Sequence, residues 1–169
     1  MKEREPSIYH QIDLFLNGMN TRFYLIVCLP LLLFVLVYLE VQSRTGISPA
    51  FESGDHIGHY VLSLVLGLSW FPAKKMYKRK ILEQRQEESL MQKLNAFRKA
   101  AIYMYLILGS AAILAIVGLY FAQEQIYLMA FGIVLILFSV NRPTPAKIIK
   151  DMKLTAEEKR MLSEYRKFL

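Results

Sequence analysis

Carboxylate and imidazole side chains gather in one short stretch of the chain, at Glu52, Asp55, His56 and His59. If this stretch is helical, one face of the helix contains Glu52, then Asp55 or His56, and then His59, at helical spacing. Oxygen and nitrogen donors in such a set can hold a divalent metal ion or respond to protons. The stretch is therefore the one candidate metal site that the sequence offers, and no other cofactor is indicated.

The same residues also have a purely structural interpretation, which we prefer. Asp55 is a natural cap for a helix that begins after it, and Ser53 and Gly54 suggest that no helix has begun before it. Polar residues are also expected in a loop that lies outside a membrane. Metal binding at this stretch is kept as a hypothesis beside the loop interpretation.

Other patterns of catalytic residues are missing from the sequence. It contains no Gly-rich phosphate loop, no Gly-x-Ser-x-Gly and no Cys-x-x-Cys, and its single cysteine, Cys28, cannot form an intrachain disulfide. We therefore predict a protein without enzymatic activity. A membrane-embedded enzyme that acts on lipid through the His and acid cluster is retained as an alternative.

The elements that would position these residues are four long apolar runs. Apolar residues make up 54% of the 169 residues, above the roughly 45–50% that is usual for soluble domains. The excess is concentrated in four blocks, which predicts an all-α bundle of four transmembrane helices and a single integral membrane domain over residues 1–169. The predicted spans cover about 23–41, 57–73, 100–121 and 126–141.

A strongly basic interval, 74–99, lies between the two apolar halves and carries nine of the 21 Lys and Arg residues. Helical spacing of its apolar residues predicts a basic helical hairpin that projects from the membrane between spans two and three. Ser89 and Gln92 have the spacing of a capping box, which predicts that the second helix of the hairpin begins there.

Amphipathic helices are predicted at both ends of the chain, in the segments 1–22 and 142–169. Near the N-terminus, apolar residues form a stripe that suits a helix lying on the bilayer surface, at Ile8, Ile12, Phe15 and Met19. Near the C-terminus, two helix starts are indicated, one by Thr144 with Pro145 and one by Thr155 with Glu158.

The distribution of cations predicts the orientation of the spans. From the N-terminus onward, the segments outside the spans hold 3, 1, 9, 0 and 8 Lys and Arg residues, so one side has 20 and the other has 1. By the positive-inside rule, both termini and the basic interval are cytoplasmic, and we expect a plasma or inner membrane location. The basic side should attract anionic lipid headgroups, and membrane proximity explains the charge without a nucleic-acid partner.

Small residues at helical spacing mark faces on which two helices can approach closely. Ser63 and Gly67 are four residues apart in the second span, and Ala111, Ala115 and Gly118 follow one face of the third. These five residues are predicted to pack helices together.

No acidic or basic residue lies deep within a predicted span, where a carrier would bind its coupled charge. The leading functional hypothesis is therefore a non-catalytic subunit, scaffold or assembly factor of a membrane complex, with a protein partner or further copies of itself. The alternative is a small homo-oligomeric channel or transporter, with a cavity lined by Ser63, Ser69, Ser110 and the glycines of the spans.

Overall fold

The computed structural model describes residues 8–43, 56–83 and 89–165. Helices are the only regular structure within these ranges, which confirms the predicted all-α class. The helices are α1 (Ile8–Ser43), α2 (His56–Leu68), α3 (Trp70–Glu83), α4 (Leu90–Ala122), α5 (Gln125–Val140), α6 (Pro145–Met152) and α7 (Ala156–Tyr165).

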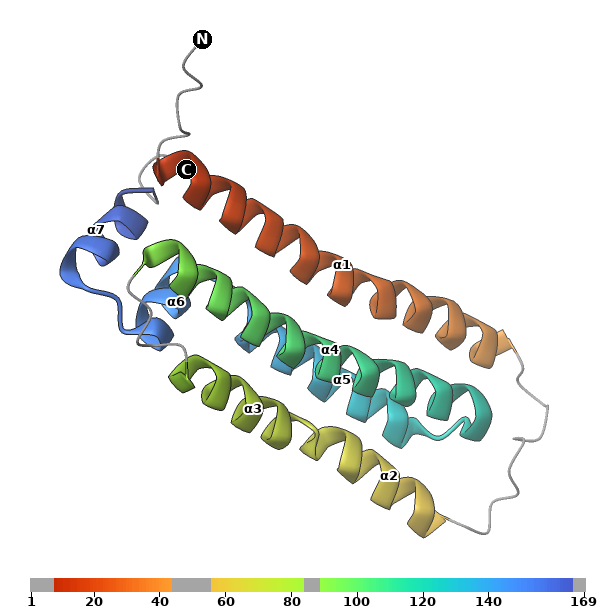
Figure 1. Ribbon diagram of the computed structural model, residues 1–169. Helices are drawn as coiled ribbons and strands as arrows, with labels where there is room; N and C mark the ends of the chain where they lie inside the picture. The colour runs from red at the N-terminus through yellow and green to blue at the C-terminus, as the bar shows by residue number, and fades with distance from the viewer. Residues whose placement is uncertain (1–7, 44–55, 84–88, 166–169) are drawn as a thin grey trace.

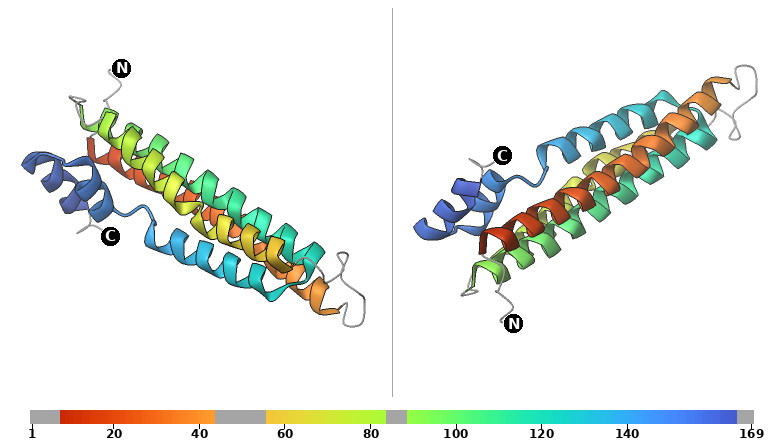
Figure 2. Two further views of the ribbon diagram at one scale, coloured as in Figure 1. Left: turned by 90° about the horizontal axis from the view of Figure 1, so that it is seen from below. Right: turned by 90° about the horizontal axis from the view of Figure 1, so that it is seen from above.

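The long helices run side by side along one axis, and α6 and α7 lie at one end of them (Figure 1). Two further views show that the starts of α1 and α4 and the end of α3 lie at the same end as α6 and α7 (Figure 2). Helix α4 contacts α1, α2, α3, α5 and α6, and is therefore the centre of the bundle.

Small residues on α4 explain its central place. Ala100, Ala111, Ala112 and Ala115 are all buried, and short side chains let neighbouring helices approach closely. Larger rings fill the remaining space, and one example is the stacked pair of Phe34 on α1 and Phe131 on α5, whose centroids are 4.1 Å apart.

Two helices, α1 and α4, are long and apolar enough to cross a membrane, and a third crossing is added if α5 and α6, which are bent by 78°, are taken as one span. Only 6% of the most apolar window of α1 is buried in the protein, against 56% for α4. The outward leucines of α1 are at least 63% exposed, namely Leu25, Leu29, Leu32 and Leu36. A soluble monomer rarely exposes so continuous an apolar face, so this surface is consistent with an integral membrane protein.

The second predicted span, 57–73, is not one helix. Helix α2 ends at Leu68 and α3 begins at Trp70, with Ser69 in a turn between them. Pro72 explains the break, because its ring clashes with the carbonyl of the residue four positions earlier, which is Leu68, and because it has no N–H to donate to that carbonyl. Pro72 itself lies in the first turn of α3, where proline is tolerated.

The predicted surface helix within 1–22 is also corrected, because α1 is continuous from Ile8 to Ser43. The stripe residues Ile12, Phe15 and Met19 are buried in the core of the bundle. The apolar face of the N-terminal segment therefore packs against protein, and α1 extends beyond the apolar region as a single helix.

The predicted helix starts differ in outcome. The Thr144 hydroxyl accepts a hydrogen bond from the backbone of Lys147 at the start of α6, as predicted. Thr155 and Glu158 form the predicted reciprocal box, with N···O distances of 2.7 and 3.4 Å. Helix α4 does begin after Ser89, as predicted, but the capping box itself is not formed, because the side chain of this N-cap residue makes no capping hydrogen bond.

The predicted basic hairpin corresponds to the end of α3 and the start of α4, which contact each other. The connection between them, 84–88, lies outside the described residues.

Candidate functional site

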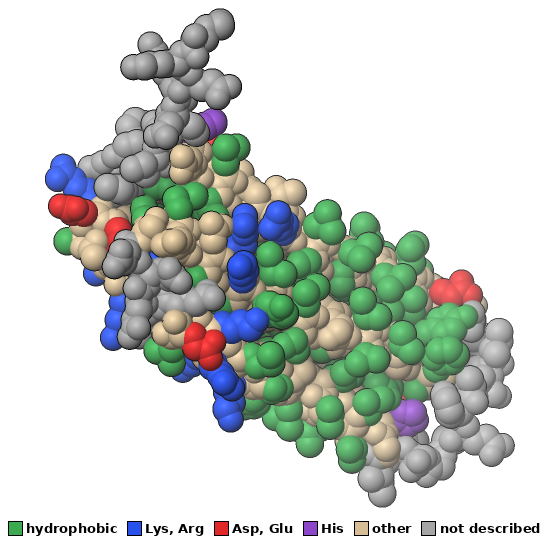
Figure 3. All heavy atoms as spheres, in the orientation of Figure 1, with side chains coloured by type: hydrophobic (Ala, Val, Ile, Leu, Met, Phe, Trp, Pro, Cys, Tyr) green, Lys and Arg blue, Asp and Glu red, His purple; other side chains and the backbone are tan. Residues whose placement is uncertain are grey.

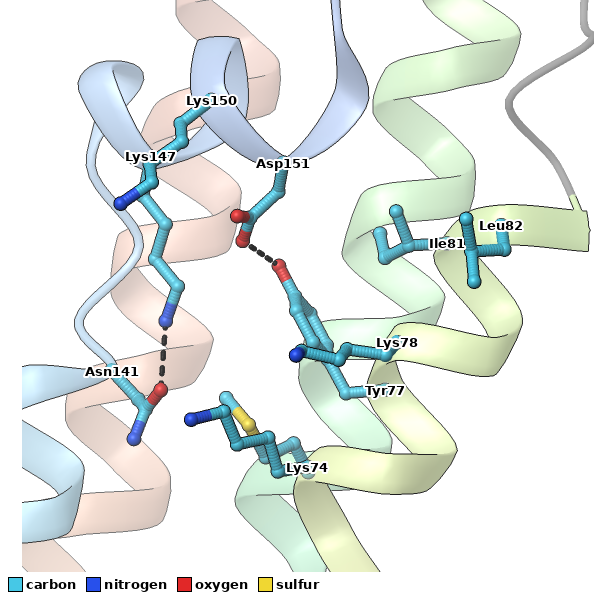
Figure 4. Close-up of a pocket in the computed structure, with 10 residues that line it drawn as sticks. Lys74, Tyr77, Lys78, Ile81, Leu82, Asn141, Lys147, Lys150 and Asp151 are labelled. Carbon is cyan, nitrogen blue, oxygen red and sulfur yellow. Dashed lines mark hydrogen bonds between the residues drawn. The ribbon is translucent and has the colours of Figure 1, made fainter.

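A cavity of about 430 Å³ lies between α3, α4 and the corner where α5 meets α6 (Figure 4). Its walls combine cations, hydrogen-bonding groups and a few apolar side chains. The lining residues are Lys74, Tyr77, Lys78, Ile81, Leu82, Met104, Asn141, Lys147, Lys150 and Asp151. We refer to this cavity as the cationic pocket.

Helical spacing places the polar groups of the pocket. On α3, Lys74, Tyr77 and Lys78 are separated by three and four residues and so share a face. On α6, Lys147 and Asp151 are four residues apart and likewise share a face. The 78° bend between α5 and α6 turns the α6 face toward α3, which brings the two sets together.

Asn141 organises the corner between α5 and α6. Pro145 has no N–H to donate to the Asn141 carbonyl, and the Tyr105 hydroxyl donates to that oxygen instead, at 2.8 Å. The Asn141 side chain donates to the Leu137 carbonyl at 2.8 Å and accepts from Lys147 Nζ at 2.9 Å. The corner is therefore held by polar contacts that leave its main-chain oxygen satisfied.

A second polar contact joins α3 to α6. The Tyr77 hydroxyl donates to the Asp151 carboxylate at 2.6 Å (Figure 4). Burial, and then the neighbouring Asp151 carboxylate, raise the pKa of Tyr77 well above its ordinary value. The phenol therefore stays protonated and acts as a permanent donor across the pocket.

Positive charge in the pocket is only partly balanced. Four lysines and one aspartate line it, which leaves a formal charge of +3. Burial lowers the pKa of Lys147; Asp151 opposes this shift and the nearby Lys74 ammonium adds to it. Lys78 and Lys150 are exposed and form no ion pair with any described residue. The pocket is thus suited electrostatically to an anion.

Three aromatic rings near the pocket each have the side chain of a Lys or Arg residue over the ring. The cation lies 3.3–5.4 Å from the ring centroid in the pairs Lys80 with Tyr103, Lys74 with Trp70, and Arg142 with Tyr24. Aromatic rings with adjacent basic residues are typical of the level at which a membrane meets water. In the face shown in Figure 3, Lys and Arg gather toward the end of the molecule at which α6 and α7 lie, and apolar side chains cover much of the rest.

The predicted metal cluster is mostly outside the described part of the chain. Glu52 and Asp55 are not described, nor is the side chain of His56. The remaining member, His59, lies on α2 with its Nδ1 2.9 Å from the hydroxyl of Tyr127 on α5. The metal hypothesis therefore stays a prediction, and His59 has a structural contact of its own.

The five predicted packing residues occupy different environments. Ala111 and Ala115 are buried on α4, and a Cβ at Gly118 would overlap the ring of Tyr127. Ser63 is 7% exposed, and its hydroxyl has no partner among the described residues. The surroundings of Gly67 lie outside the described part.

The sequence analysis did not find the cationic pocket, although each of its lysines entered the charge count. The available signal was the Asn-Arg-Pro-Thr-Pro segment, which starts at Asn141 and ends α5 sharply. Nothing in that segment gives the direction in which α6 turns. No protein-family model matches the chain, and no match was found among curated proteins or solved structures.

Proposed function

We propose that this chain is an integral membrane protein that crosses the bilayer four times, with spans within α1, within α2 and the first turn of α3, within α4 and within α5. In this proposal it acts as a non-catalytic subunit, scaffold or assembly factor of a membrane complex. The observation that carries the proposal is the division of the surface into an exposed apolar belt and a cationic end.

The height of the belt supports a membrane-spanning bundle. On α4, the stretch from Tyr103 to Tyr120 is about 25 Å long at the usual helical rise. This length is close to the roughly 30 Å of a bilayer's hydrocarbon core, especially where the membrane thins locally. Exposed apolar residues lie between these levels on α1, α4 and α5.

The orientation in the proposal follows from charge. The end with α6 and α7 corresponds to the side that holds 20 of the 21 Lys and Arg residues by sequence. We place this end, and both termini, in the cytoplasm of a cell with the chain in its plasma or inner membrane. The helices α6 and α7 would then form a cytoplasmic surface for a partner.

The positions of three serines favour a subunit over a channel. Ser69 donates to the Leu66 carbonyl at 2.6 Å, and Ser110 is exposed and donates to the Ile107 carbonyl at 2.8 Å. Only Ser63 lines a described cavity, an otherwise mainly apolar groove between α2 and α5. The three hydroxyls therefore do not converge on one shared path.

A groove of about 300 Å³ between the starts of α1 and α4 is a suitable place for partner contact. It is lined in part by Leu14, which is 60% exposed, and by Arg98. Under the proposed topology this groove faces the cytoplasm.

The test is purification of the tagged full chain in a mild detergent after crosslinking in cells. We expect a defined second protein to co-purify, and Leu14→Gln to weaken its recovery severalfold while the exposed control Gln92→Ala does not. Recovery of the chain alone, as a defined homo-oligomer, would count against the subunit function and in favour of the channel alternative.

A further inference from the structure

We propose that the cationic pocket is a binding site for the phosphate group of an acidic phospholipid, with Lys74, Lys78 and Lys147 as the main cationic contacts. This inference depends on the membrane location under Proposed function and goes beyond it, because it assigns a ligand class to particular residues.

The first support is the unbalanced charge. Lys147 is half-buried and, among the described residues, its ammonium group donates a hydrogen bond to the neutral Asn141 amide alone, with Lys74 close enough to repel it. Placing like charges in one partly dehydrated cavity is unfavourable unless an anion joins them. Asp151 supplies one negative charge against the four lysines that line the pocket. A bound phosphate would supply the missing negative charge.

The second support is the direction of the side chains. The ammonium groups of Lys74 and Lys78 project from α3 toward the space in which the Lys147 ammonium lies on the opposite wall (Figure 4). A phosphate held between the walls could accept hydrogen bonds from both sides, and charge-assisted bonds of this kind are short and strong.

The third support, which favours a lipid over free phosphate, is the position of the pocket at the edge of the apolar belt. Phe71, one turn before Lys74, is 60% exposed, and Val140, which directly precedes Asn141, is 71% exposed. The aromatic pair of Trp70 with Lys74 marks the same level. A headgroup in the pocket would therefore leave its acyl chains against Phe71 and Val140.

Trp70 allows a direct test, because it is the only tryptophan in the chain and Lys74 Nζ lies 4.0 Å from its ring. The full chain would be reconstituted in nanodiscs of phosphatidylcholine in which a growing fraction of lipid is brominated on its acyl chains. Bromine quenches tryptophan at short range. We expect brominated phosphatidylglycerol to quench Trp70 at a much lower fraction than brominated phosphatidylcholine.

Substitutions identify the lysines that create the preference. From the usual contribution of a well-placed lysine to anionic-lipid binding, Lys74→Gln with Lys147→Gln should reduce the preference for phosphatidylglycerol by about 10- to 30-fold. The matched control, Lys75→Gln with Lys99→Gln, removes the same charge from exposed residues outside the pocket and should keep it. Lys74→Arg with Lys147→Arg should retain most of the preference. This result would show that the Gln variant loses the preference because it loses charge and not because it misfolds.

The outcomes separate the possible explanations. Equal losses in the pocket and control variants would show diffuse surface attraction and overturn the site. Relief of quenching by inorganic phosphate or glycerol 3-phosphate as effectively as by phosphatidylglycerol would assign the pocket to soluble phosphate and overturn the lipid proposal. If the protein inserts stably into the bilayer but shows no lipid preference, this inference alone is overturned. If the protein fails to insert, the proposed function is overturned as well.

Discussion

At the residue scale, Tyr127 shows how single side chains join the helices at the end opposite the cationic pocket. Its ring lies against Gly118 on α4, and its hydroxyl is 2.9 Å from His59 Nδ1 on α2. Tyr127 is only 2% exposed. A glycine is required at position 118 because any side chain there would displace the ring and the contact that it makes with His59.

The corresponding prediction is that Gly118→Ala destabilises the protein although alanine is the better helix former. The displaced ring should cost about 1–3 kcal/mol, the usual range for overpacking. Gly132→Ala on α5 is the matched control, because a Cβ there meets nothing within 4 Å, and it should be neutral or stabilising by up to about 1 kcal/mol. Thermal unfolding in detergent, followed by circular dichroism, measures both, and equal behaviour of the two variants would refute the role of Gly118.

At the element scale, the helix starts could be read from the sequence and the relations between helices could not. Thr155 and Glu158 predict the start of α7 correctly, because capping is local and depends on neighbours in the chain. The apolar run 57–73 predicts one continuous span, but the effect of Pro72 falls four residues earlier in the chain and divides α2 from α3. The cationic pocket depends on where α6 lies relative to α3. This is a tertiary relation, and the periodicity of apolar residues in the sequence does not predict it.

Helix α7 is tethered to α4 by one well-shielded ion pair. Lys93 Nζ and Glu158 Oε1 are 2.8 Å apart, and the two side chains are only 11% and 12% exposed. Burial alone would raise the pKa of Glu158, but the hydrogen bonds from Lys93 and Thr155, together with the charge of Lys93, outweigh it and lower the pKa below its ordinary 4.5.

The sign of this shift predicts a pH dependence. A carboxyl group with a lowered folded-state pKa stabilises the fold above its unfolded-state pKa, and this contribution disappears as the pH falls through the folded-state value. At neutral pH, Glu158→Gln should therefore reduce the free energy of unfolding by about 1.5–3 kcal/mol. The unfolding temperature should fall accordingly. The difference from the parent protein should begin to shrink as the pH falls toward 4.5, and it should vanish only once the pH is below the still lower folded-state pKa of Glu158. Glu157→Gln, an exposed neighbour, should match the parent throughout, and a difference that persists in acid would contradict the ion-pair explanation.

At the scale of the whole molecule, the protein is a helical bundle whose surface changes character along its axis. Apolar residues of α1, α4 and α5 form the exposed belt, and cations gather at the end where α6 and α7 lie. A layered environment of hydrocarbon between two aqueous phases matches this surface, and an aqueous environment alone does not. The proposed subunit function and the lipid site both depend on this placement.

The most direct test of the placement is cysteine labelling in intact cells. In a background with Cys28→Ser, one variant would carry Gln125→Cys at the start of α5 and another Lys159→Cys on α7, both exposed positions. We predict that a membrane-impermeant maleimide labels Gln125→Cys from outside and Lys159→Cys only after the cells are permeabilised. Labelling of Lys159→Cys in intact cells, or equal access to both positions, would contradict the four-span membrane topology.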